Sequence, residues 1–182
     1  MVRHTVLLVA CCLSVVLLQS SGAALTGDIT KDPADVVKKY AELDFKGARL
    51  EAGTQEVLFP YIAWAGEPAW GAIVVVDRYD VLNHTSDWSI LSLLEVVIPV
   101  EYQVLGTMYW QTAVFLPERR VERVSFHVKG QSHRWRLIAP QMPPHVGVKR
   151  MINFVRHAML QERDPSRLEK LTALRDHLQG AT

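Results

Sequence analysis

The stretch RVSFHVKGQSHRWRL, residues 123–137, alternates apolar and polar side chains on both sides of a short polar segment. A side-chain period of two on either side of a glycine-containing segment predicts a β-hairpin. One face of the hairpin is expected to be apolar, with Val124, Phe126, Val128, Trp135 and Leu137. The other face is expected to be basic, with Arg123, His127, Arg134 and Arg136 around Ser125.

The glycine suggests the register of this hairpin. A type II′ turn requires glycine at its first central position, and Gly130 fits that requirement. We therefore expect Phe126 to pair with Trp135, and His127 to pair with Arg134.

Three upstream segments rich in β-branched and aromatic residues predict further strands: Ile73–Leu82, Glu95–Val104 and Met108–Leu116. We expect Gly106 to interrupt the chain between the last two, and Pro117 to turn it before the hairpin. Pro99 cannot donate a ladder hydrogen bond, so it predicts an edge strand or a bulge. The result is a sheet of four or five antiparallel strands.

Helices are predicted on both sides of these strands. Asp32 and Pro33 supply an N-cap and a first-turn proline, and Gly47 ends that helix. Residues 148–159 have apolar side chains at helical spacing, and a capped helix with a leucine stripe begins after Asp164. Helices, then strands, then helices predict an α+β fold with helices covering one face of the sheet.

The first 24 residues have the pattern of a secretory signal. Arg3 supplies positive charge, Thr5–Leu18 is an almost unbroken apolar run, and small residues follow. This run is shorter than the roughly 20 residues that span a bilayer as a helix. We expect cleavage after Ala23 or Ala24 and a secreted or periplasmic protein. The alternative is a lipoprotein cleavage box at Cys11, but few apolar residues precede that cysteine.

Composition limits the classes of function. Cys11 and Cys12 are the only cysteines, so the exported chain has no disulfide and no cysteine metal site. Removing the signal takes away one of 20 basic side chains and none of 19 acidic ones, which leaves a formally neutral chain. That balance argues against nucleic-acid binding. Motifs for nucleotides, serine hydrolases and zinc proteases are absent. We expect His127 and His133 on opposite faces, and neither a metal nor a cofactor.

Two residues of the first helix are candidates for catalysis. Asp44 follows Tyr40 by one helical turn, so both can project under a curved sheet, where burial would raise the pKa of the carboxyl group. A general base requires such a position. The structural alternative, which we favour, is that Asp44 bonds the turn at Gly47 or pairs with Arg49.

Aromatic side chains are candidates for ligand binding. Indole N–H groups in a concave apolar site suit a planar ligand, although tryptophans also commonly form the core. The candidate ligand-binding residues are Tyr40, Trp64, Tyr102, Trp110 and Trp135.

Several segments also carry a family resemblance: Val36-Val37 with Tyr40, Leu43–Leu50, the strand near Tyr79, Val100–Gly106, and Trp135–Ile138 with Pro140. From about Asp32 to Met159 the chain resembles small exported proteins of the nuclear transport factor 2-like superfamily, which includes ketosteroid isomerases and scytalone dehydratases. The resemblance implies a cone-shaped α+β fold, with N-terminal helices packed in a curved antiparallel sheet around a pocket. It also implies a domain over residues 25–162, with a C-terminal amphipathic helix over residues 163–182.

The resemblance leaves the function open, because members of this superfamily include enzymes, ligand binders and assembly modules. The isomerases use an acid and a tyrosine, but neither aligns to a position in this chain. We favour an exported, non-catalytic domain that binds a small apolar molecule or a protein partner. The alternative is a cofactor-free isomerase or dehydratase that uses Asp44 and Tyr40 for proton transfer.

The basic hairpin face bears on assembly. Dimers of this superfamily usually form through the open side of the sheet. Like charges brought together across a two-fold axis repel unless acids such as Glu101 or Glu122 lie between them. We expect a monomer or a salt-sensitive homodimer, and contact with the membrane only transiently, through the signal peptide.

Overall fold

The computed structural model describes residues 32–51 and 53–181, and the predicted signal peptide and Cys11 lie outside these ranges. The elements are α1 (Pro33–Phe45), η1 (Thr54–Leu58), β1 (Ile73–Val81), η2 (Thr85–Asp87), β2 (Ser89–Ser92), β3 (Glu95–Tyr109), β4 (Val114–Gln131), β5 (Arg134–Ala139), β6 (His145–Gly147), α2 (Val148–Gln161) and α3 (Pro165–Gly180). The protein is thus α+β, as expected.

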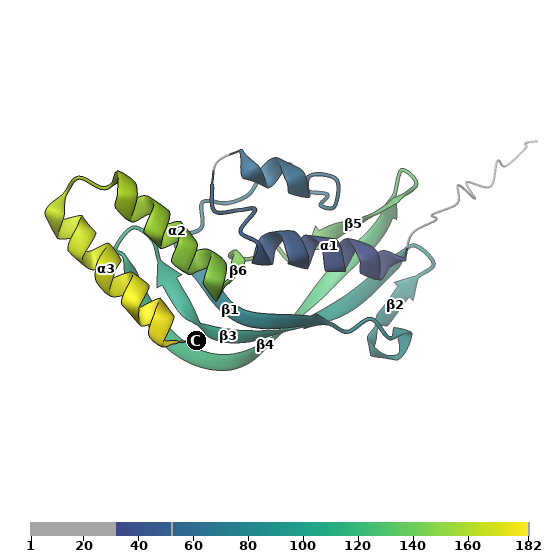
Figure 1. Ribbon diagram of the computed structural model, residues 1–182. Coiled ribbons are helices and arrows are strands. Elements are labelled where there is room, and N and C mark those ends of the chain that lie inside the picture. The colour runs from purple at the N-terminus through teal and green to yellow at the C-terminus, as the bar shows by residue number, and fades with distance from the viewer. Residues whose placement is uncertain (1–31, 52, 182) are drawn as a thin grey trace, which may run out of the picture.

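The sheet is curled and mixed. Its strand order is β5-β4-β3-β1-β6, and β2 pairs with β3 beyond the end of β1. Figure 1 shows the sheet curving beneath α1. The prediction of a purely antiparallel sheet is wrong, because the short strand β6 pairs parallel to β1, with Val74 opposite His145. The loop that follows β5 leads the chain back to the edge of β1, where β6 pairs with it.

Helix α1 forms where its cap and its apolar stripe predicted it. The Asp32 carboxylate accepts a hydrogen bond from the Ala34 N–H at 2.9 Å, and the chain leaves the helix through Gly47 at a φ of 82°. Val37 and Tyr40 are fully buried. They pack into the concave side of the sheet in a core that includes Phe126 and Trp135.

Helices α2 and α3 form a second core at one end of the molecule. Val74 and Val76 of β1 belong to the α1 core, whereas Val75 belongs to the core of α2 and α3. Because successive side chains of a strand point to opposite faces, the helices cover both faces, not the single face predicted. The leucine stripe of α3 packs on its own chain, with Leu171, Leu174 and Leu178 buried.

The strands β3 and β4 are longer than expected. Gly106 does not end β3 and Pro117 does not turn the chain, because the two residues pair with each other inside one long hairpin. The pairing shifts next to Gly106, and a Cβ there would lie 2.3 Å from the Leu116 carbonyl oxygen. Glycine and proline therefore mark a bulge with close backbone approach. The turn comes earlier, before Val114, with Ala113 at a φ of 55°.

The register predicted for the β4–β5 hairpin is also wrong. Ser132 and His133 have φ values of 47° and 64°, as the two central residues of a type I′ turn require. Trp135 therefore lies opposite Gly130, and Arg134 lies opposite Gln131. The observed pairing differs from the predicted pairing by an even number of residues, so each side chain stays on its predicted face. Phe126 and Trp135 are both buried although they do not pair.

Pro99 lies in a central strand, because β3 pairs with both β1 and β4. Its carbonyl accepts a hydrogen bond from the Leu82 N–H at 3.0 Å, just past the end of β1. In a strand the N–H and C=O of one residue point to the same side, so the N–H that proline lacks would face the place where β1 has ended. The prediction of an edge strand or a bulge is wrong, because β3 is a central strand and its register with β4 does not shift at Pro99. The missing donor costs little there.

Candidate functional site

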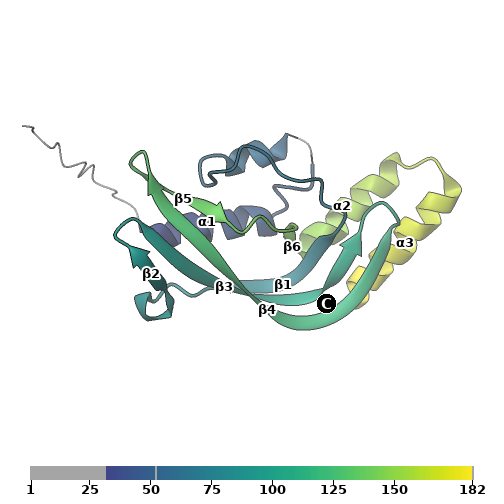
Figure 2. The same cartoon turned by 180° about the vertical axis from the view of Figure 1, so that it is seen from behind.

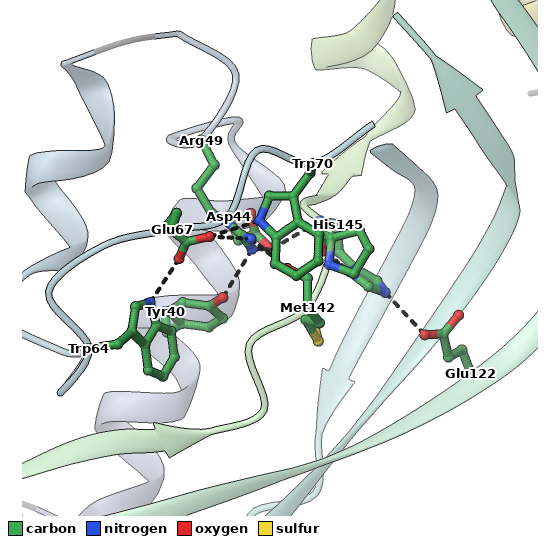
Figure 3. A network of polar contacts seen from close by, with 10 residues as sticks. Tyr40, Asp44, Arg49, Trp64, Glu67, Trp70, Glu122, Met142 and His145 are labelled. Carbon is green, nitrogen blue, oxygen red and sulfur yellow. Dashed lines mark hydrogen bonds and ion pairs between the residues drawn. The ribbon is translucent and has the colours of Figure 1, made fainter. Parts of the chain in front are cut away.

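A buried polar cluster centred on Arg49 lies between the end of α1, the loop before β1 and the segment before β6 (Figure 3). The guanidinium donates to the Asp44 carboxylate at 3.3 Å, the Tyr40 hydroxyl at 3.1 Å and the Glu67 carboxylate at 2.6 Å. It also donates to the Met142 carbonyl. The Arg49 side chain is only 3% exposed, so these contacts are shielded from water and hold three segments of the chain together.

Glu67 organises the outer side of this cluster. Its carboxylate accepts hydrogen bonds from the indole N–H groups of Trp64 and Trp70, at 2.9 Å and 3.0 Å. The Arg49 guanidinium also lies 5.8 Å from the centre of the Trp70 ring, within cation–π range. Two tryptophans are therefore fixed by one carboxylate, and Arg49 neutralises its charge.

Asp44 has the structural partner that we favoured. One carboxylate oxygen faces Arg49 and accepts a hydrogen bond from the His145 backbone N–H at 3.0 Å. The other oxygen is buried without a hydrogen-bond partner, as is the Tyr102 hydroxyl. Burial raises the pKa of Asp44, and the charge of Arg49 opposes that rise. Burial and pairing thus act on Asp44 in opposite directions.

His145 links the cluster to the sheet. Its Nδ1 lies 2.8 Å from the Pro143 carbonyl oxygen and its Nε2 lies 3.3 Å from the Glu122 carboxylate. Both partners are hydrogen-bond acceptors, so the imidazole ring lies between a carbonyl oxygen and a carboxylate. The hydrogen bond from His145 lowers the pKa of Glu122 to about 2. The ring also packs against Tyr102, with centroids 4.5 Å apart.

A groove of about 270 Å³ opens beside the cluster, and Arg49 and Glu67 line it. Its remaining wall is mostly apolar: Leu50, Gln55, Pro68, Ala69, Trp70, Ile73, Trp110, Pro144 and Phe154. Trp110 and Phe154 pack with ring centroids 4.7 Å apart, and Arg167 lies over the Trp110 ring. The groove therefore combines aromatic surface with one buried ion pair.

The structure separates the predicted ligand-binding residues into three places. Tyr40 and Trp64 pack edge to face beside Arg49, and Tyr102 contacts His145. Trp110 lies on the wall of the groove. Trp135 lies in the core beneath α1.

Sequence reasoning missed four members of the cluster: Glu67, Trp70, Glu122 and His145. They lie on different elements, and no motif spacing connects them. Glu67 between two tryptophans, each three residues away, was the one local signal.

Of the two acids that we named, only Glu101 lies on the basic hairpin face, where Glu95 also pairs with basic side chains. Arg123 lies 3.8 Å from Glu101, and Glu95 contacts both His127 at 2.7 Å and Lys129 at 3.4 Å. Glu122 lies on the inner face instead, where it also pairs with Arg120.

Among the described residues, no helix combines the length and apolar character that crossing a membrane requires. Within residues 32–51 and 53–181, metal-binding side chains do not gather in groups of three or more. Comparisons with protein-family models, curated proteins and solved structures found no match to this chain.

Proposed function

We propose that this protein is an exported, non-catalytic domain that binds a small apolar molecule in the groove beside Arg49, built on a cone-shaped fold of the nuclear transport factor 2-like type. The observation that supports this proposal is the groove itself, with the aromatic side chains of Trp70, Trp110 and Phe154 around a buried Arg49–Glu67 pair. Ligand sites are typically apolar hollows with a few fixed polar groups.

The contacts of Arg49 define the ligand further. Its guanidinium already faces the carboxylates of Asp44 and Glu67, so a third anion is not needed for charge balance. Its Nε, by contrast, is buried without a hydrogen-bond partner. That nitrogen is covered by protein atoms, so the proposed ligand contacts the apolar wall of the groove rather than Nε.

The geometry gives less support to the alternative, a proton-transfer enzyme. Asp44 and Tyr40 are both 0% exposed, and Arg49 contacts both of them. A general base must come within hydrogen-bond reach of the substrate. Here the chain would have to open before a substrate could reach the Asp44 carboxylate.

The test uses the neutral apolar dye N-phenylnaphthylamine, with mass spectrometry of small molecules that remain with the protein during native purification. Ala69 is an exposed residue on the groove wall, so Ala69→Trp should fill the groove. Ala65 is exposed in the same loop but does not line the groove, so Ala65→Trp is the matched control.

We expect Ala69→Trp to weaken dye binding by about tenfold or more, the equivalent of losing one buried apolar side chain. Ala65→Trp should bind as the wild type does. Equal binding by all three proteins, or no binding by the wild type, would refute the proposal.

A further inference from the structure

A run of apolar side chains projects into solvent at the β2–β3 turn. The apolar tip consists of Ile90, Leu91, Leu93 and Leu94, which are 67%, 57%, 97% and 48% exposed. An isolated exposed leucine needs no explanation, but four exposed apolar side chains within five consecutive residues mark this turn as a candidate interaction surface.

A basic turn lies beside the apolar tip. The Gly130 N–H donates to the Leu94 carbonyl at 2.8 Å, which joins the tip to the β4–β5 hairpin. Beyond this bond the hairpin carries His133 and Arg134, both exposed. The leucines therefore lie at the same end of the sheet as Arg134 and His133.

The same end of the molecule is where the chain enters the fold. Figures 1 and 2 place the start of α1, strand β2 and the β4–β5 turn at one end, and α3 at the other. The residues before Pro33 include the apolar run Thr5–Leu18. The segment that follows this run during export therefore joins the domain at the same end as the apolar tip.

We propose that the apolar tip docks the protein on a lipid bilayer, with its leucines among the acyl chains and Arg134 and His133 at the headgroup phosphates. A bilayer fits the shape, because Leu93 protrudes from a turn almost without neighbours and can be buried by a fluid surface that has no preformed pocket. Peripheral proteins bind membranes through this combination of apolar burial and positive charge.

Apolar insertion supplies most of the affinity. Glu95 and Lys129 pair with each other beside the tip, and Asp87 is exposed in η2, so the excess positive charge is small. Binding should therefore occur on neutral lipid. An anionic lipid should strengthen it only about fivefold per unpaired arginine at low salt.

The experiment measures co-sedimentation of the full chain with vesicles of phosphatidylcholine, with and without phosphatidylglycerol. The variant is Leu93→Ser. Its matched control is Leu160→Ser, because Leu160 is 84% exposed on α2, and Figure 1 shows α2 away from β2. We expect Leu93→Ser to weaken binding to both vesicles about tenfold, and Leu160→Ser to change nothing. Arg134→Gln should remove only the gain from phosphatidylglycerol.

A second readout separates the tip from the apolar N-terminal run. Cys11 and Cys12 are the only cysteines of the sequence, so replacing both by serine removes every thiol. A Leu93→Cys or Leu160→Cys substitution in that background then allows one environment-sensitive dye to be attached at the chosen position. Vesicles should shift the emission of the dye at position 93 and leave the dye at position 160 unchanged. A dye at position 93 that stays in water overturns the proposal. So does a Leu93→Ser variant that loses self-association while keeping vesicle binding, because the tip would then contact a second copy of the chain.

Discussion

Replacing Arg49 by methionine keeps most of the side-chain volume and removes the charge that Asp44 and Glu67 face. The side chains of Arg49, Asp44 and Glu67 are 3%, 1% and 10% exposed, so the Asp44 carboxylate cannot recover its hydration without opening the fold, and Glu67 can do so only from the groove. Removing one partner of a buried ion pair typically costs about 3–5 kcal/mol. We expect a loss of that size in the free energy of unfolding, a large part of the roughly 5–15 kcal/mol typical of a domain.

The loss should depend on pH. Burial already raises the pKa of Asp44 above 3.8, and the charge of Arg49 limits that rise. Without Arg49 the folded-state pKa rises further, and the folded state then binds protons that the unfolded chain releases. Such a group destabilises the fold as pH rises through the interval between its unfolded and folded pKa values. The cost of Arg49→Met should therefore be smaller near about pH 4 than near about pH 7.

Urea denaturation followed by circular dichroism at both pH values measures this cost. Arg150→Met is the control, because Arg150 pairs with Glu51 at 2.9 Å through side chains that are 35% and 52% exposed. An exposed pair contributes about 0–1 kcal/mol. If Arg49→Met costs no more than Arg150→Met, or costs the same at both pH values, the cluster is hydrated and the reasoning fails.

Three further substitutions, one of them with a matched control, test other parts of the fold. His145 lowers the pKa of Glu122 from 4.5 to about 2, so the stabilisation by the ionised Glu122 is present above pH 4.5 and is lost as pH falls toward 2. In Glu122→Gln, the free energy of unfolding from urea titrations should therefore change less over this pH interval than in the wild type. A Cβ at Gly106 would lie 2.3 Å from a β4 carbonyl oxygen, so Gly106→Ala should cost about 1–3 kcal/mol by calorimetry. Gly71→Ala, where a Cβ meets nothing within 4 Å, should cost much less. Trp135 is 9% exposed, so Trp135→Ala should cost about 3–5 kcal/mol, and an unchanged denaturation midpoint would show that the indole is not buried.

Local sequence determined the helices and the faces of the strands. Asp32 and Pro33 start α1 and Gly47 ends the segment after it, because caps and glycine conformations depend on a few neighbouring residues. The alternation in residues 123–137 assigned Phe126 and Trp135 to the core correctly, since a side-chain period of two follows from backbone geometry alone.

Tertiary structure decided the turns. Gly130 and Pro117 looked like turn residues, yet both lie inside β4, and the hairpin turns at Ser132 and His133. Turn propensities differ by small free energies, whereas the pairing of long strands sums many contacts and selects one register. Gly130 therefore lies opposite Trp135 and Pro117 lies opposite Gly106, both within paired strands rather than in turns.

The sequence identified Asp44, Tyr40 and Arg49 as neighbours because they lie within a few turns of chain. It could not supply the rest of the cluster, since the Met142 carbonyl that Arg49 contacts is 93 residues away and the His145 N–H that Asp44 accepts is 101 residues away. The free energy of a buried charge depends on which groups surround it and on how far water is excluded. Both are properties of the folded chain, so the remaining members of the cluster and its groove were decided by the tertiary structure.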